Sequence, residues 1–183
     1  MNFCSTCAAP VVQRIPPDDD RLRFVCDACG SIFYQNPKII AGCVPIWEDR
    51  VLLCKRAIEP RLGLWTVPAG FMENGETTAE GAARETREEA NAVVEIDRLH
   101  CYLDIPRINQ VYVIFLGHLV APEFSPGAES LETELCAEED IPWDDLAFPS
   151  IVIALDKYFE DRRTGNTAPH LERIDRRTWR RPR

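Results

Sequence analysis

Six glutamates are crowded into residues 70–92, which read GFMENGETTAEGAARETREEANA. At about 100° per helical residue, Glu85, Glu88 and Glu89 fall within one arc of roughly 100°. Three carboxylates so close together repel one another, and hard divalent cations such as Mg²⁺ relieve that repulsion by binding carboxylate oxygens. The spacing therefore indicates a site for a divalent cation on one face of a helix.

The same segment carries the signals that would form this helix. Thr77 and Glu80 have the spacing of a capping box, which predicts a helix from Thr78 to Ala90. The face beside the carboxylates is small, so it can pack closely on a sheet, and it consists of Ala79, Ala82, Ala83, Thr86 and Ala90. Gly81 lies on the carboxylate side, one turn earlier, where we expect it to leave room for a ligand.

Four of the eight cysteines form two close pairs near the N-terminus. Cys4-x2-Cys7 and Cys26-x2-Cys29 are separated by 18 residues, which is the spacing of a four-thiolate zinc site. Four protein ligands leave no place for water, so the expected zinc ion is structural. The other four cysteines, at positions 43, 54, 101 and 136, lie in or beside predicted strands and are expected to be buried, reduced thiols.

Composition limits the classes of function. The chain has 183 residues and a formal net charge of −9, which argues against nucleic acid as the main partner. No apolar run approaches the ~20 residues of a membrane span. No export signal is visible either, so a cytoplasmic location is expected. An arginine-rich stretch closes the chain, with Arg173, Arg176, Arg177, Arg180, Arg181 and Arg183.

The hydrophobic pattern predicts an α+β fold made of strands and two helices. Strands are expected at residues 39–44, 50–55, 64–67, 93–99, 110–120 and 131–136. A second helix is expected at residues 151–159. We divide the chain into a zinc ribbon (1–36), a main domain (37–165) and an arginine-rich tail (166–183).

The glutamate segment resembles the Nudix box, G-x5-E-x7-R-E-U-x-E-E-x-G-U, in which U is a bulky aliphatic residue. The matching positions are Gly70, Glu76, Arg84, Glu85, Glu88 and Glu89. Thr86 and Ala92 replace aliphatic residues, which affects packing only. Asn91 replaces glycine, and asparagine tolerates the left-handed backbone of a helix end. The resemblance implies the Nudix α/β/α sandwich with a mixed sheet.

It also implies Mg²⁺- or Mn²⁺-dependent hydrolysis of a nucleoside diphosphate linked to another group. Glu85, Glu88 and Glu89 would then bind the metal, with a backbone carbonyl near Gly70 as a further ligand. Arg84 is placed to pair with Glu76 and brace the loop. The general base is either a box glutamate or a downstream one, and the downstream candidates are Glu129, Glu132 and Glu134, of which Glu132 enters our candidate site.

The resemblance extends beyond the box, over roughly residues 4–163. The zinc-ribbon Nudix proteins that include a plant chloroplast FAD pyrophosphatase are similar to this chain in six runs: YQNPKIIAGC, VLLCKR, GLWTVPAGF, LDIPRINQVYVIFLGHL, SPGAESLE and IPWDDLAFPSI. FAD, split into FMN and AMP, is therefore the first expected substrate. ADP-ribose and NADH are alternatives, although the SQPWPFP-like signature of ribbon-bearing NADH pyrophosphatases is missing.

Aromatic side chains would bind a flavin or adenine ring. Trp65 and Phe71 are the candidates that we place in the substrate site with Gly70, and Tyr102, Tyr112 and Phe115 are further ones. A homodimer is also an expectation that the resemblance carries. The hypothesis from another class is a regulator that senses nucleotides without cutting them, but such proteins usually lack part of the glutamate set, which is intact here.

Overall fold

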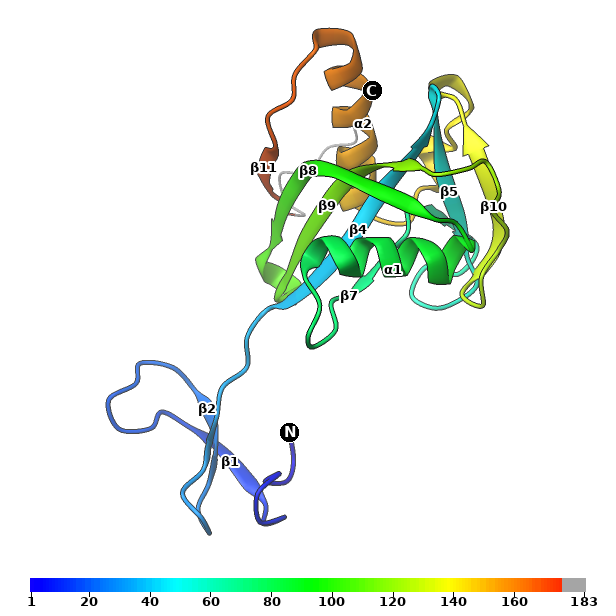
Figure 1. Ribbon diagram of the computed structural model, residues 1–183. Coiled ribbons are helices and arrows are strands. Elements are labelled where there is room, and N and C mark those ends of the chain that lie inside the picture. Colours follow the sequence, from blue (N-terminus) through cyan, green and yellow to red (C-terminus); the bar gives the residue numbers. More distant parts are fainter. Residues whose placement is uncertain (176–183) are drawn as a thin grey trace. The chain divides into compact units, whose positions relative to one another are not determined.

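The chain divides into two compact units, which are described separately. The structure is a computed structural model that describes residues 1–175 (Figure 1). The units are Met1–Pro37 and Lys38–Arg183. Arg176 and the arginines after it, which the sequence analysis assigned to a tail, lie outside the described residues.

The smaller unit is a three-stranded antiparallel sheet in the order β1-β2-β3. Its strands are β1 (Val11–Arg14), β2 (Arg23–Cys26) and β3 (Ile32–Phe33). Little apolar surface is buried in it: the buried apolar residues here are Cys4, Pro16, Val25 and Cys26. A unit with so small a core needs another source of stability, such as a bound metal ion.

The larger unit is built on a mixed sheet in the order β10-β5-β4-β9-β8-β11. These strands are β4 (Lys38–Trp47), β5 (Arg50–Arg56), β8 (Val94–Ile105), β9 (Gln110–Leu119), β10 (Ser130–Cys136) and β11 (His170–Arg173). Two short strands join it, β6 (Trp65–Thr66) beside β5 and β7 (Ala69–Phe71) beside β4. The pairs β4–β9 and β8–β11 are parallel, and the others are antiparallel.

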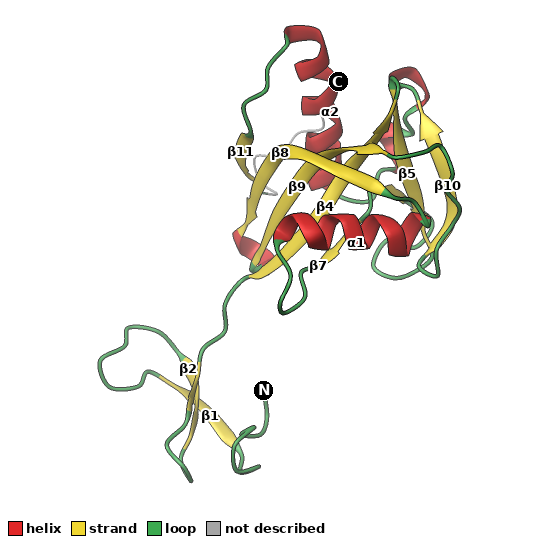
Figure 2. Cartoon of the chain, viewed as in Figure 1, coloured by secondary structure: helices red, strands yellow, loops and turns green. Residues whose placement is uncertain are grey.

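The two helices, α1 (Thr78–Ala90) and α2 (Pro149–Thr164), cover opposite faces of this sheet (Figure 2). The alternation along β4 shows why. Ala41 and Cys43 pack with Ala82 of α1, whereas Val44 and Ile46 belong to the core cluster that contains the buried side of α2. Successive strand residues point to opposite faces, so one strand serves both layers. The predicted α/β/α sandwich with a mixed sheet is confirmed.

Three 3₁₀ turns complete the larger unit: η1 (Pro106–Ile108), η2 (Glu138–Asp140) and η3 (Trp143–Asp145). The four cysteines predicted to be core thiols, at positions 43, 54, 101 and 136, are all buried and free.

Helix α1 has the predicted ends. The Thr77 side chain accepts a hydrogen bond from the Glu80 N–H, and the Glu80 side chain accepts one from the Thr77 N–H. Asn91 closes the helix in the left-handed conformation, with φ 49°. The expectation for Gly81 is wrong: a Cβ there would lie 2.8 Å from Glu76 Oε1 and 3.2 Å from the Ala41 Cβ. The space beside Gly81 is used for helix–sheet packing and not for a ligand.

Two strands of the larger unit were not predicted from the sequence. Strand β7 is three residues long and follows a proline, so it shows no alternation by itself. Strand β11 lies within the region assigned to the tail, and it pairs in parallel with β8 from His170 to Arg173. The exposed fraction of Leu171 is 73%, so this strand also lacks the hydrophobic pattern of a buried one.

We predict that Leu155→Ala destabilises the larger unit by about 2–5 kcal/mol, because Leu155 is fully buried and its loss leaves a cavity. Leu131→Ala, at a side chain that is 51% exposed, is the control and should change the free energy of unfolding by less than about 0.5 kcal/mol. Chemical denaturation followed by tryptophan fluorescence reports on this unit, since residues 1–37 contain no tryptophan. Equal effects of the two changes would contradict the layer assignment.

Candidate functional site

Arg84, in the middle of α1, is the centre of a hydrogen-bond network that connects the helix to the loop before it. Its Nε and Nη2 atoms donate to the two oxygens of Glu76, at 3.0 and 2.8 Å. Its Nη1 atom donates to Glu85 Oε1 at 2.7 Å and to Glu88 Oε2 at 2.9 Å. The remaining Nη2 donor reaches the Phe71 carbonyl at 3.1 Å. A guanidinium has five N–H donors, and all five are used here.

This network fixes the loop before the helix to the helix itself. The Arg84 guanidinium lowers the pKa of Glu76 to about 2, so the pair stays charged far below neutral pH. Glu76 also accepts a hydrogen bond from the Glu73 N–H at 2.7 Å. The predicted bracing of the loop by Arg84 and Glu76 is therefore present, and it extends to two of the three candidate metal ligands.

Two of these candidate ligands are buried between α1 and the sheet. The exposed fractions of Glu85 and Glu89 are 8% and 6%. Burial raises the pKa of Glu85, and it raises that of Glu89 to about 8, with the neighbouring Glu85 charge adding to the effect. Gly70 lies directly against Glu85, since a Cβ on Gly70 would overlap that carboxylate.

These groups fit a divalent cation. Among the described residues, the buried Glu89 Oε2 atom has no hydrogen-bond partner. The Glu85 carboxylate has Arg84 as its salt-bridge partner, and Glu88 shares the same guanidinium. A buried carboxylate oxygen without a partner is costly unless a cation or a proton neutralises it. Oxygen ligands suit Mg²⁺ or Mn²⁺.

The loop that joins β9 to β10 is attached to the C-terminal end of α1. The Ser125 and Gly127 N–H groups donate to the carbonyls of Ala90 and Glu89, both at 2.9 Å. The Asn91 side chain donates to the Ser125 and Pro126 carbonyls, at 3.2 and 3.0 Å. A Cβ on Gly127 would overlap the Glu88 carbonyl, so only glycine permits this close approach.

The attached loop brings Glu129 to the carboxylates of α1. After burial, which is the larger effect, the negative charge of Glu129 helps to raise the pKa values of Glu85 and Glu89. Glu132 lies further along, on β10, where its Oε1 accepts a hydrogen bond from Lys55 Nζ at 2.7 Å. Glu129 therefore acts electrostatically on the glutamate cluster, whereas Glu132, the candidate from the sequence, pairs with Lys55.

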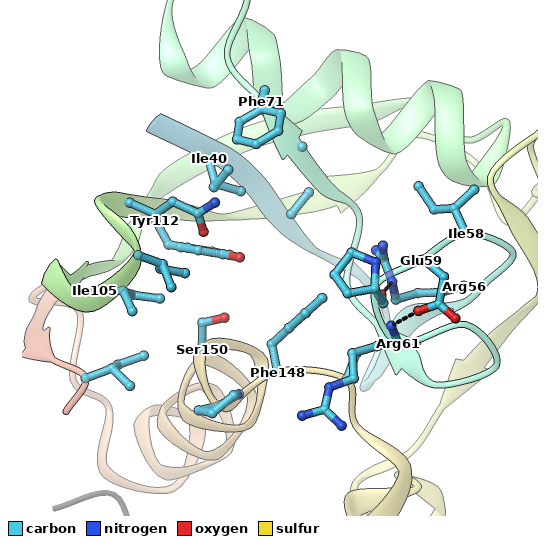
Figure 3. A pocket seen from close by; sticks show the side chains of 18 of the residues that line it. Ile40, Arg56, Ile58, Glu59, Arg61, Phe71, Ile105, Tyr112, Phe148 and Ser150 are labelled. Atoms are coloured by element: carbon cyan, nitrogen blue, oxygen red, sulfur yellow. Dashed lines mark hydrogen bonds between the residues drawn. The ribbon is translucent and has the colours of Figure 1, made fainter. Parts of the chain in front are cut away.

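The larger unit contains a cavity of about 530 Å³ (Figure 3). It lies close to the glutamates of α1, because Gly70 in its lining contacts Glu85. Strand β7 separates the two, since Ala69 and Gly70 line the cavity and Gly70 contacts Glu85. Aromatic rings from three elements also line it, and these are Phe71, Tyr112 and Phe148. Three arginines complete the wall: Arg56, Arg61 and Arg107. The cavity therefore combines flat apolar faces with positive charge.

The aromatic candidates from the sequence separate into two groups. Phe71 and Tyr112 line the cavity, as the substrate role would require. Trp65 does not: it is half-buried against the hydrophobic core, beside the Lys55 ammonium. Phe115 packs against the cluster under α1, and Tyr102 lies outside the cavity lining. Phe148 lies within the run IPWDDLAFPSI, but it was missed as a candidate because it precedes a helix and shows no periodicity of its own.

Arg56 is a further residue that sequence reasoning did not single out. Its guanidinium lies 5.2 Å from the centre of the Phe148 ring and lines the cavity. Its positive charge also acts on Glu89, whose pKa it lowers against the dominant effect of burial. Arg56 therefore contributes positive charge both to the aromatic cavity and to the surroundings of Glu89.

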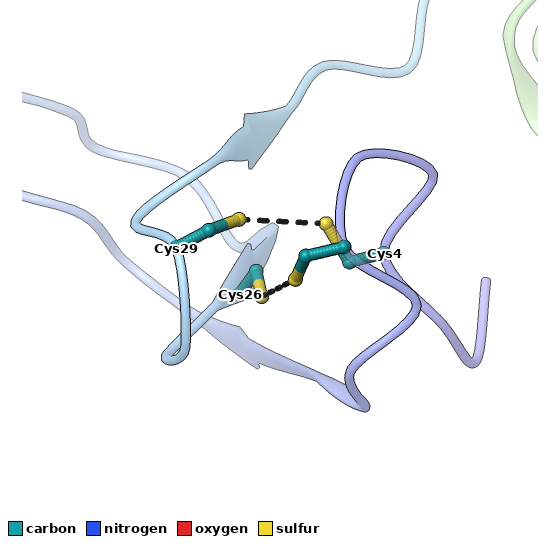
Figure 4. Close-up of side chains that lie close together, drawn as sticks. Cys4, Cys26 and Cys29 are labelled. Carbon is teal, nitrogen blue, oxygen red and sulfur yellow. Dashed lines mark hydrogen bonds between the residues drawn. The ribbon is translucent and has the colours of Figure 1, made fainter.

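The four N-terminal cysteines come together as their spacing predicts (Figure 4). The Sγ atoms of Cys4 and Cys29 are 3.6 Å apart, and those of Cys7 and Cys26 are 3.5 Å apart. All four sulfur atoms lie within 4.8 Å of one another. Zn–S bonds of about 2.3 Å in a tetrahedron place sulfurs nearly 4 Å apart, so the cluster fits a structural zinc ion.

Comparison with known families agrees with both sites. Residues 2–35 match the zinc-ribbon family described as Nudix N-terminal, and residues 36–159 match the NUDIX domain. The chain belongs to the Nudix family. Nudix enzymes use a divalent metal ion such as Mg²⁺, which is the ion that the glutamate cluster fits.

Three known proteins illustrate this membership. A crystal structure of a NUDIX hydrolase from Nitrosomonas europaea is 53% identical, with a TM-score of 0.92 over 95% of this chain and 99% of that one. An NAD-capped RNA hydrolase, NudC, from Photobacterium profundum is 29% identical over 75% of this chain. An ADP-ribose pyrophosphatase from Methanocaldococcus jannaschii is 26% identical over 60%. The chain spans 50% of the Photobacterium protein and 67% of the archaeal one.

We predict that Arg84→Lys reduces kcat by roughly 100-fold, because a single ammonium cannot hold Glu76, Glu85 and Glu88 together and misplaced ligands slow the reaction. Arg87→Lys, at an exposed position on the same helix, is the matched control and should keep the wild-type rate. Steady-state kinetics with saturating Mg²⁺ separates kcat from KM. An unchanged kcat in Arg84→Lys would show that the network does not position the glutamates.

We predict that Cys26→Ser removes the zinc ion of residues 1–37 and makes this segment sensitive to limited proteolysis, because the unit has almost no core without the metal. Cys136→Ser, at a buried cysteine of the larger unit, should keep the full zinc content. Elemental analysis of both variants measures the difference. Zinc retained in Cys26→Ser at the wild-type level would contradict the four-thiolate site.

Proposed function

We propose that this protein is a Mg²⁺-dependent pyrophosphatase that hydrolyses a nucleoside diphosphate linked to a second group. The observation that carries the proposal is the cluster of Glu85, Glu88 and Glu89, in which Arg84 holds the first two, beside a cavity with aromatic and arginine side chains. A divalent cation on these glutamates would neutralise phosphate charge and activate water for attack at phosphorus. The names of the relatives, an ADP-ribose pyrophosphatase and an NAD-capped RNA hydrolase, support this reaction class.

The chain itself would bind and orient the substrate. Gly70 allows the Glu85 carboxylate to approach the strand that lines the cavity. Arg56 would contact the diphosphate, since it lines the cavity and its positive charge acts on Glu89. Phe71, Tyr112 and Phe148 would hold a flat ring, because aromatic faces stack on one another. Binding energy gained in the cavity would then place the diphosphate at the glutamates.

FAD is the substrate that we propose first, with FMN and AMP as products. The resemblance in the six sequence runs leads to this choice, and a cavity of about 530 Å³ with several aromatic faces suits one large ring system of a dinucleotide. ADP-ribose and NADH share the ADP half of FAD and stay as alternatives. An NAD-capped RNA is a further one, although a net charge of −9 does not favour a long nucleic acid.

The deciding experiment offers FAD, NADH, ADP-ribose and NAD-capped RNA in parallel with Mg²⁺, to wild type and to Glu88→Gln. We expect wild type to release FMN and AMP faster than the products of the other substrates. Glu88→Gln should lose most of the activity, while Glu95→Gln, at an exposed glutamate of β8, should keep it. Faster cleavage of another substrate would show that FAD is not the preferred substrate and would leave the proposed mechanism unchanged. Tight nucleotide binding without cleavage would contradict the enzymatic function and favour the nucleotide-sensing regulator.

Glu129 is the general base that we propose. Glu129→Gln should lower kcat by roughly 10²–10⁴-fold, since an amide cannot accept a proton from the attacking water. Glu132→Gln removes another exposed carboxylate, one that pairs with Lys55, so it is the matched control and should change kcat little. The reverse result would return the role to Glu132. Loss of activity in neither variant would assign it to a glutamate of α1.

Within residues 1–175, no helix is long and apolar enough to cross a bilayer. A homodimer and a cytoplasmic location stay predictions from the sequence.

A further inference from the structure

Three side chains far from the glutamate cluster meet on the α2 side of the sheet. They are His100 of β8, Asp161 of α2 and His170 of β11. One potential ligand atom from each lies within 4.8 Å of the others. His170 Nε2 is 2.9 Å from Asp161 Oδ2, and His100 Nδ1 is 3.7 Å from the same oxygen. The mechanism proposed above uses none of the three.

The hydrogen bond made by His100 Nε2 determines whether His100 Nδ1 can act as a metal ligand. His100 Nε2 lies 2.8 Å from the Ala154 carbonyl oxygen, which can only accept, so Nε2 carries the N–H. The neutral ring then turns the lone pair of Nδ1 toward Asp161. His100 is fully buried, and its Nδ1 atom has no hydrogen-bond partner among the described residues.

The buried Nδ1 lone pair of His100 faces the Asp161 carboxylate, and a cation between the two atoms would satisfy both. A proton on Nδ1 would not form a good hydrogen bond, because 3.7 Å exceeds the range for an N–H donor and an oxygen acceptor. Zinc bonds of about 2.0–2.2 Å to nitrogen and oxygen place two tetrahedral ligand atoms about 3.3 Å apart. The distances of 2.9 and 3.7 Å lie on either side of this value.

We propose that His100, Asp161 and His170 form a second metal site, for Zn²⁺ or a similar transition-metal ion. Histidine ligands typically donate their other ring N–H to a backbone carbonyl, as His100 does to Ala154. Asn166 holds the Asp161 carboxylate through a hydrogen bond of 2.8 Å. A cavity of about 230 Å³, lined by Asp161 and Asn166 together with Arg98 and Arg162, adjoins the carboxylate side of the cluster.

The metal ion would fasten the last strand to the rest of the fold. Strand β11 has four residues, lies at the edge of the sheet and leaves Leu171 73% exposed, so its own hydrophobic contacts are few. Through His170 the ion would join β11 to both β8 and α2. The ion would thus add a cross-link to the pairing of β11 with β8 and to the core contact of the neighbouring Ile174.

The test counts zinc in the full chain without a polyhistidine tag, reloaded with zinc in excess Mg²⁺ so that the glutamates hold magnesium. Wild type should retain a second zinc ion beyond that of the ribbon. His170→Gln should lose this second ion, although glutamine still offers Asp161 an N–H donor, and Asp161→Asn should lose it too. His118→Ala removes the remaining histidine, which is exposed on β9, and should retain both ions.

A second readout separates metal loss from misfolding. Added zinc should raise the melting temperature of His118→Ala and of Cys26→Ser, which lacks the ribbon ion, but not that of Cys26→Ser with His170→Gln. Wild type with only the ribbon zinc, or a second ion that persists in His170→Gln and Asp161→Asn, would overturn the proposal. In the first case the three residues would be a hydrogen-bonded contact, and in the second the ion would bind elsewhere.

Discussion

Repulsion between neighbouring carboxylates is the constraint on which the larger unit depends. Glu76, Glu85 and Glu88 carry like charges within hydrogen-bond reach of one side chain, Arg84. A guanidinium can hold all three because its donors form a rigid planar fork, which an ammonium lacks. The arrangement compensates only part of the charge, since the Glu89 Oε2 atom stays buried without a partner among the described residues. This incomplete neutralisation of the carboxylates supports the proposed cation site.

The two proposed reaction components, the glutamates and the cavity, are joined by one short strand. Strand β7 pairs with β4, and its Gly70 contacts Glu85 on one side while lining the cavity on the other. The loop at Gly127 attaches to the opposite end of α1 and brings Glu129 to the cluster. Helix α1 is therefore fixed at both ends, which keeps its carboxylates in one geometry relative to a bound substrate.

Metal ions would serve a different purpose in each of the three sites that this chain offers. The four sulfurs of the smaller unit replace a hydrophobic core that 37 residues cannot build. The carboxylates of α1 are oxygen ligands and suit a cation that acts on phosphate. The proposed site of His100, Asp161 and His170 would fasten an edge strand. The ligand type would therefore match the role of the metal ion: thiolates where it stabilises the fold, oxygens where it acts on phosphate, and imidazoles where it links an edge strand to the rest of the sheet.

The sequence by itself determined the features that depend on local spacing. The capping box of Thr77, the carboxylate face of α1 and the two cysteine pairs each lie within a few residues of chain, where helix geometry or a tight turn fixes the positions. The apolar, β-prone runs likewise predicted most of the long strands. Only the tertiary structure decided which distant groups meet. Attachment of the loop at Gly127 gives Glu129 its electrostatic effect on the glutamates of α1. The fold brings Phe148 to the cavity, and the pairing of β11 with β8 brings His170 to His100. Loop attachment and strand pairing leave no periodic signal in the sequence.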